Sequence, residues 1–335
     1  MKHRSHAGGR AEWIGRRDLI AVLGGAIAWP ETIWAATAPP HVAFLAVGFG
    51  AGDTAASDAI REALRSLGEV EGQTYVPEVH AWNDVSPQLA AQLVAAKPAV
   101  IVAITATAVP TLVKLTQAIP IVVAFLTGDP AALGFSKSVA RPTGNVTGLF
   151  TLQDVLLWKK VELLGRLVGP LKRVGLLYQA GTYAQDILLA KAKNRKNAAD
   201  PEIVPLGISS GAELSTVLDR EEARDIDGLV VAGGPMIGAG LETLIAGEIA
   251  RRLGAVHDFS FETEAGALAS YGPEPAENLQ RAAEYTARLL HGANIADLPF
   301  ESPRTIRFSL NMRTARALGL AIPPTPLAIA DNVIE

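Results

Sequence analysis

A serine within a glycine-rich turn is a candidate nucleophile. Residues 207–211 match the pattern Gly-x-Ser-x-Gly, in which a sharp turn between a strand and a helix exposes a catalytic serine, here Ser209. Asp227 and His257 follow in the chain order of α/β hydrolases, so a carboxylate-oriented imidazole could accept the serine proton. Serine and glycine are also ordinary capping residues where a strand meets a helix, and no His-Gly-Gly segment lies upstream to form an oxyanion hole. An exported α/β hydrolase using Ser209, Asp227 and His257 is therefore one hypothesis.

Three other kinds of site are disfavoured. The turn at 48–53 lacks the last glycine of the dinucleotide-binding pattern, because Asp53 stands there, and the chain has no GxxxxGK[ST] phosphate loop. The chain has no cysteine, and its six histidines show no HxxxH or HExxH spacing. We therefore expect no cofactor and no metal.

Composition limits the partners. Among 335 residues, 49% are hydrophobic and 19% are charged, which is typical of a folded protein rather than a disordered one. The net charge is −4, so no basic excess exists to neutralise phosphates and we expect no nucleic-acid partner.

The first residues have the pattern of an export signal. Five basic residues precede position 18, an apolar run covers 19–29, and small residues fill 35–38. The run is too short to cross a bilayer as a helix, and this order is typical of a secretory signal. Arg16 and Arg17 also resemble a twin-arginine signal, so both the Sec and the Tat route stay open. We expect residues 1–38 to be a signal peptide and the protein to be periplasmic.

The remaining sequence alternates strands and helices. Buried strands are predicted at 41–47, 74–82, 99–104 and 119–126 and, after a Gly- and Pro-rich loop at 129–150, at 174–178, 202–208, 228–232, 255–259, 268–271 and 305–310. Helices are predicted between them, among them one at 212–225. This alternation predicts an α/β protein with parallel sheets, and about ten strands fit two Rossmann-like lobes better than one sheet. The chain should first cross between lobes within 129–150.

Ligands of such sheets bind beyond the carboxyl ends of the strands, so residues there are the candidate ligand contacts. Thr105 and Thr107 could hold a carboxylate or merely cap a helix, Asp258 could hold an ammonium group, and Asp129 before a proline could be only a turn residue. Phe49 and Tyr183 could stack on a ring. The full predicted set is Phe49, Asp53, Thr105, Thr107, Thr127, Asp129, Tyr178, Tyr183, Gly233, Asp258 and Tyr271.

Four stretches together resemble a known family. They are LGEVEGQ at 67–73, IPIVVAFLTGDP at 119–130, RPTGNVTG at 141–148, and the tail segments at 311–324 and 330–335. In combination they resemble the ABC-transporter substrate-binding proteins of the tryptophan/tyrosine type, which are type I periplasmic binding proteins. One departure is Gln179-Ala-Gly181, where the family often has Asn-Pro.

The resemblance implies two Rossmann-like lobes joined by three crossings, with a small molecule, possibly an amino acid, closed between them. It implies a binding protein without catalysis that delivers its ligand to a membrane permease, and we expect a monomer. The expected lobes are 39–149 with about 271–300, and 150–270 with about 303–320, followed by a tail at 321–335. The same fold could instead serve as the ligand-sensing domain of a signalling system.

Overall fold

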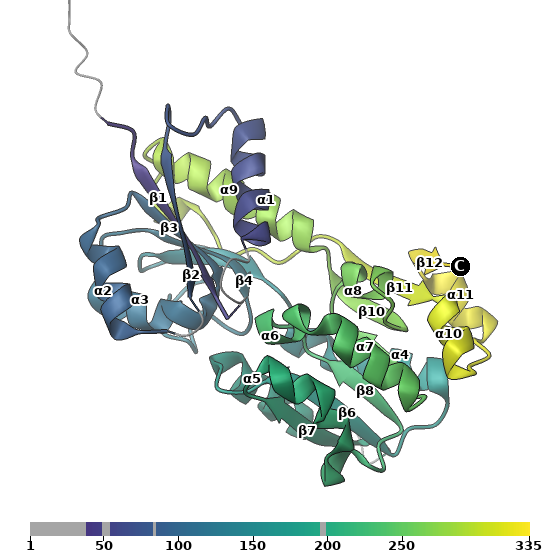
Figure 1. The fold of residues 1–335 in the computed structure, drawn as a ribbon. Coiled ribbons are helices and arrows are strands. Elements are labelled where there is room, and N and C mark those ends of the chain that lie inside the picture. The colour runs from purple at the N-terminus through teal and green to yellow at the C-terminus, as the bar shows by residue number, and fades with distance from the viewer. Residues whose placement is uncertain (1–37, 49–53, 83–84, 195–198) are drawn as a thin grey trace, which may run out of the picture. The chain divides into compact units, whose positions relative to one another are not determined.

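The computed structural model describes residues 38–48, 54–82, 85–194 and 199–335 (Figure 1). Residues 39–335 form one compact unit, and the expected signal peptide lies outside the described residues except for Ala38. In the described segments no helix is both long and apolar enough to cross a membrane.

The first sheet has five parallel strands in the order β2-β1-β3-β4-β5. Its strands are β1 (His41–Val47), β2 (Val76–Trp82), β3 (Val100–Thr105), β4 (Ile121–Leu126) and β5 (Val146–Phe150). Helices α2 (Pro87–Ala95) and α3 (Val109–Leu115) pack on one face, and α1 (Ala55–Ser66) packs on the other. Burial on both faces explains why the central strands are continuous apolar runs. The prediction of 41–47 as a strand is confirmed, and β2 lies at an edge of the sheet, where a proline such as Pro77 is tolerated.

The second sheet has seven strands in the order β12-β11-β10-β9-β8-β6-β7. They are β6 (Arg173–Gln179), β7 (Glu202–Ile208), β8 (Gly228–Val231), β9 (Ala255–His257), β10 (Ala269–Pro273), β11 (Ile306–Asn311) and β12 (Asn332–Ile334). The pairing is parallel except between β10 and β11. The covering helices are α4 (Gln153–Val168), α5 (Tyr183–Lys193), α6 (Pro235–Ala239), α7 (Leu241–Ala250), α8 (Ser260–Glu264), α10 (Met312–Leu318) and α11 (Pro324–Ile329).

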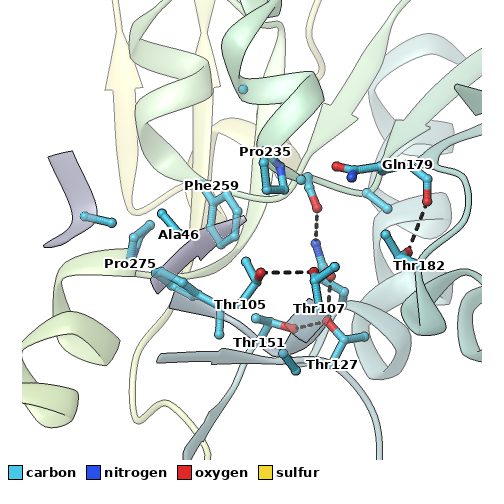
Figure 2. Close-up of a pocket in the computed structure, with 18 of the residues that line it drawn as sticks. Ala46, Thr105, Thr107, Thr127, Thr151, Gln179, Thr182, Pro235, Phe259 and Pro275 are labelled. Atoms are coloured by element: carbon cyan, nitrogen blue, oxygen red, sulfur yellow. Dashed lines mark hydrogen bonds between the residues drawn. The ribbon is translucent and has the colours of Figure 1, made fainter. Parts of the chain in front are cut away.

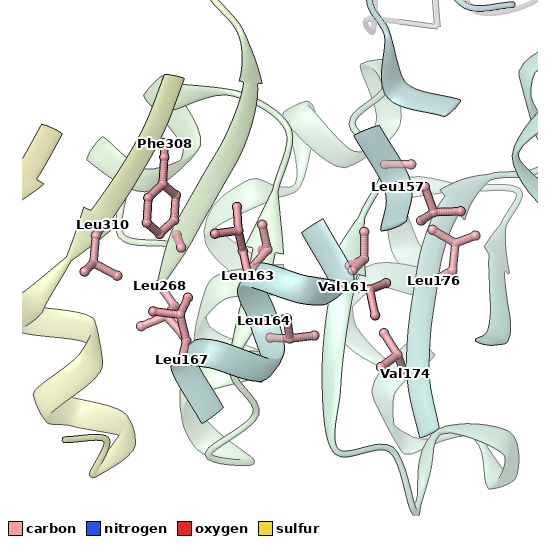
Figure 3. Close-up of a cluster of buried hydrophobic side chains, with 14 of the residues drawn as sticks. Leu157, Val161, Leu163, Leu164, Leu167, Val174, Leu176, Leu268, Phe308 and Leu310 are labelled. Atoms are coloured by element: carbon pink, nitrogen blue, oxygen red, sulfur yellow. The ribbon is translucent and has the colours of Figure 1, made fainter. Parts of the chain in front are cut away.

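Helix α4 supplies the main apolar face of the second core. Leu157, Val161 and Leu164 recur at helical spacing and lie over Val174 and Leu176 of β6, as Figure 3 shows. All five side chains are buried in one cluster. The 4-3 spacing of these residues therefore places them on one buried face of α4.

The chain crosses between the two lobes three times. It leaves the first sheet after β5 at residues 151–152, returns after β10 to form α9 (Pro275–Leu290) beside α1, and passes back near 302–305 into β11 (Figure 1). Asn278 anchors α9, because its buried Nδ2 donates hydrogen bonds to the carbonyls of Ala124 (3.0 Å) and Phe150 (3.1 Å). The first crossing therefore comes just after the 129–150 loop, since β5 inside that loop joins the first sheet.

Two other expectations need adjustment. The prediction of a helix at 212–225 is wrong, because this segment forms three short 3-10 helices, η2 (Gly211–Ser215), η3 (Val217–Asp219) and η4 (Glu221–Ala223). Glu213 accepts hydrogen bonds from the backbone of Ser209 and the hydroxyl of Ser210, and Arg220 is extended, so the segment turns instead of continuing. The structure places the expected tail in the second sheet, through pairing of β12 with β11.

Gly272 of β10 is where two backbones approach most closely beside the site. A Cβ atom at this position would overlap the carbonyl oxygen of Asp258. We therefore expect Gly272→Ala to lower the free energy of unfolding by about 1–3 kcal/mol in urea denaturation. Gly211→Ala is the matched control, because no atom lies within 4 Å of its added Cβ. Equal stability of the two variants would contradict this prediction.

Candidate functional site

A cavity of about 470 Å³ lies where the carboxyl ends of both sheets meet (Figure 2). Its walls include Ala46 and Thr105 at the ends of β1 and β3, and Tyr178 and Gly233 at the ends of β6 and β8. This volume lies within the range of small-molecule sites, and the strand ends are where ligands of parallel sheets bind.

Five of the predicted contacts line this cavity. They are Thr105, Thr107, Thr127, Tyr178 and Gly233. The hydroxyl oxygens of Thr105 and Thr107 lie 3.1 Å apart and share a hydrogen bond. Burial raises the pKa of Tyr178, so its phenol is neutral at ordinary pH.

The structure places other predicted contacts away from the cavity. Asp129 accepts a hydrogen bond from the backbone of Ala131 (2.9 Å), which is the turn role weighed for it. Tyr271 belongs to β10 and packs edge-on against Phe308, with ring centroids 6.5 Å apart. Phe49 and Asp53 lie outside the described residues, as does the side chain of Tyr183, so their roles stay predictions.

Asp258 lies directly behind the cavity wall instead of in it. Its side chain is 1% exposed and forms an ion pair with Lys160 of α4, which is also 1% exposed. Its Oδ2 accepts hydrogen bonds from the Gly233 backbone (2.6 Å) and from Nε2 of Gln153 (2.5 Å). Asp258 therefore does not hold a ligand ammonium group as expected, because protein donors already occupy both of its carboxylate oxygens.

Gln153 was missed at the sequence level, although it connects the two lobes. Its Oε1 accepts a hydrogen bond from the hydroxyl of Thr127 after β4 (2.8 Å), and its Nε2 donates to the carbonyl of Gly233 after β8 (2.7 Å). The Thr127 hydroxyl also lies 2.9 Å from that of Thr151. Thr127, Thr151 and Gln153 line one side of the cavity and are called the cavity floor below.

One feature of the sequence could have indicated that Lys160 has a buried partner. It lies three residues after Leu157 and four before Leu164, on the apolar face of α4, where an unpaired lysine is rarely tolerated. Burial lowers its pKa to about 7, against the opposing effect of the Glu262 and Asp154 carboxylates. A partner was therefore required, and Asp258 supplies it.

His257, next to Asp258, lies in a second buried ionic cluster. Its Nε2 is 3.0 Å from Glu248 and its Nδ1 is 3.8 Å from Glu262. Burial opposes the imidazolium form, but Glu248 and Glu262 outweigh it and raise the pKa of His257 to about 10. Glu262 also accepts hydrogen bonds from the backbone of Asp258 and Phe259 (3.1 and 2.8 Å), which fixes the end of β9.

Aromatic rings from both lobes form an apolar wall. The rings of Phe125 of β4 and Phe259 after β9 lie 6.3 Å apart at 60°, and Phe259 stacks on Phe261 at 5.7 Å. All three line the cavity. In the described part of its lining there is no lysine, arginine or histidine, and Glu262 is the one carboxylate.

The model of the family described as "ABC transporter substrate binding protein" matches residues 47–334. The chain belongs to this family. It is similar to the "Tyrosine-binding protein" of Clostridioides difficile (strain R20291), at 25% identity over 268 residues, covering 77% of this chain and 75% of that protein.

Solved structures agree on the fold. An ABC domain from Streptococcus pneumonia in complex with L-Trp superposes with a TM-score of 0.76 at 21% identity, covering 88% of this chain and all of that one. A conserved domain protein from Vibrio cholerae gives 0.75 at 22% identity, covering 89% and 100%. The family, and the two-lobed α/β fold expected from sequence, are confirmed.

The hydrolase hypothesis is wrong for this substrate-binding protein. The Asp227 carboxylate accepts hydrogen bonds from the backbone of Lys172 and Arg173 (2.6 and 2.8 Å), at the amino end of the sheet, whereas Ser209 follows the carboxyl end of β7. His257 is buried and held by glutamates. The three residues form no triad, and related proteins bind solutes.

The buried cluster predicts an unusual histidine. We expect the His257 imidazole to stay protonated at neutral pH and to titrate near pH 10, because two carboxylates flank it. Its folded pKa is raised, so its contribution to stability is complete below the ordinary value of 6.5 and is lost as the pH rises through about 10. Imidazole ¹⁵N shifts against pH measure this, with His257→Gln assigning the signal. Titration of the His257 ring near pH 6.5 would contradict it.

Proposed function

We propose that this protein is the exported solute-binding component of an ABC uptake transporter and that it encloses an amino acid or related compound between its lobes. The cavity walled by both lobes carries this proposal. Three chain crossings beside that cavity can act as a hinge, so burial of a ligand would favour the closed form that a permease recognises.

The cavity suits an aromatic amino acid. Phe125 and Phe259 offer apolar faces for a ring. The hydroxyls of Thr105 and Thr107 can hold a carboxylate, and so can Ser57 in the first turn of α1, whose buried Oγ has no hydrogen-bond partner among the described residues. The names of relatives support the same class, since one is a tyrosine-binding protein and another was solved with L-Trp.

The sequence supports export of the protein to the compartment where this function would take place. The basic, apolar and small-residue segments of 1–38 favour removal as a signal peptide and a periplasmic location, by the Sec or the Tat route. A membrane permease and the small-molecule ligand are the proposed partners, and the protein is proposed to act as a monomer.

L-tyrosine or L-tryptophan should bind saturably and be recovered unchanged. A ligand present at 100 times its Kd stabilises the folded state by about 2.7 kcal/mol, which raises Tm by a few degrees. We expect Phe125→Ala and Thr105→Val each to weaken binding about ten-fold or more, measured by calorimetry, because each removes a ligand contact.

Thr216→Val is the matched control, because Thr216 is exposed in the 3-10 segment and does not line the cavity. Its affinity should equal that of the wild type. Absence of binding by both amino acids, or equal loss in the control, would contradict the proposed ligand class.

A further inference from the structure

We infer that the buried Lys160–Asp258 ion pair sets the hydrogen-bond polarity of the cavity floor, so that Thr151 accepts a hydrogen bond from a ligand amine or hydroxyl group. The inference rests on the proposed function and specifies it: the floor is where the amino group of an amino acid binds. Asp258, Lys160 and Gln153 are positioning residues, since they act through Thr151.

The carboxylate of Asp258 acts as a hydrogen-bond acceptor. Lys160 contacts its Oδ1, and both side chains are 1% exposed. A backbone N–H can only donate, and that of Gly233 lies 2.6 Å from Oδ2 of Asp258, so this oxygen is an acceptor. The two groups that approach its Oδ2, the Gly233 backbone N–H and the Gln153 amide, must therefore donate.

This acceptor fixes the orientation of the Gln153 amide. One end faces the Asp258 carboxylate and the carbonyl of Gly233, and both of these are acceptors. Only the NH₂ end of the amide can satisfy them, so the amide oxygen must face Thr127. The opposite orientation would set three acceptors against one another in a buried site.

The orientation of the Gln153 amide in turn fixes the directions in which the hydroxyls of Thr127 and Thr151 donate. The Gln153 oxygen lies 2.8 Å from the Thr127 hydroxyl and needs a donor, so the Thr127 hydrogen points to it. The Thr151 hydroxyl, 2.9 Å from Thr127, must then give its own hydrogen to Thr127 or to the carbonyl of Leu126 at 3.4 Å. In both cases the hydrogen is used inside the protein, and the Thr151 oxygen offers lone pairs to the cavity that it lines.

An acceptor at this depth discriminates between ligands. Thr151 is 3% exposed, so a ligand group that excludes solvent from its oxygen must itself supply a hydrogen bond to that oxygen. An ammonium, amine or hydroxyl group does so, whereas a carboxylate or a methylene group does not. A hydrogen bond with a charged partner in such a site corresponds to a preference of about ten- to a hundred-fold.

The test compares ligands that differ only in the amino group. L-tyrosine and L-tryptophan are paired with 3-(4-hydroxyphenyl)propionate and indole-3-propionate, and Kd values are measured by calorimetry. The wild type should prefer each amino acid about ten-fold or more. Thr151→Val should bring this ratio close to one by weakening only the amino acids. Asp258→Asn should reduce it less, because the carbonyl of Gly233 still holds the NH₂ group of Gln153 when the carboxylate is lost.

Controls separate this role from general damage. Thr105→Val should weaken both members of a pair equally and leave the ratio unchanged, because both carry the carboxylate. Where Asp258→Asn does not fold, Gln153→Met interrupts the same connection without leaving Asp258 protonated or Lys160 unpaired, and it should lower the ratio too. The Tm of each variant without ligand verifies folding.

Two results would overturn the inference. Equal binding of amine and deaminated compounds to the wild type, or a ratio unchanged in Thr151→Val, would exclude Thr151 as the acceptor and leave the proposed function intact. Failure of all four compounds to bind would instead overturn the aromatic amino acid proposal, and this inference with it.

Discussion

The side-chain amide of Gln153 is the contact on which the geometry of the cavity depends. It is the first residue of α4, directly after the crossing at 151–152, and it bonds Thr127 of one lobe and Gly233 and Asp258 of the other. All its polar atoms have partners, so its loss would leave several buried groups unpaired, at about 1–3 kcal/mol each. This amide therefore holds the ends of β4, β8 and β9 at fixed positions around the ligand.

The buried charges behind the cavity floor are better explained by the way they orient neighbouring groups than by a contribution to stability. Replacing a buried ion pair by apolar groups is often neutral or stabilising, so the Lys160–Asp258 pair alone is weak evidence of a stable lobe. What the carboxylates provide is orientation: Asp258 holds the backbone N–H of Gly233, and Glu262 holds that of Phe259. These bonds place one polar and one aromatic wall of the cavity. A fold that needs only a core could be built without them.

The sequence predicted the parts of the structure that depend on local pattern. Continuous apolar runs located β1 and β3, and the rule that ligands bind at strand ends found Thr105, Thr127 and Tyr178. Contacts between residues far apart in the chain could not be predicted. Lys160 and Asp258 are 98 residues apart, and nothing in the local sequence pairs them. Asp258 was placed correctly at its strand end, but a protein cation occupies it where a ligand cation was expected.

The polar groups that line the cavity restrict the identity of the ligand more than family membership does. Gln179, where the resemblance leads one to expect Asn-Pro, lines the cavity. Its amide oxygen accepts a hydrogen bond from the backbone of Met236 (3.3 Å), so among the described residues its NH₂ group is the part left to meet a ligand. That wall thus offers a donor where the floor offers an acceptor. Two relatives with the same aromatic wall could therefore bind different compounds, because the wall selects by shape, whereas Gln179 and Thr151 select by the direction of hydrogen bonds.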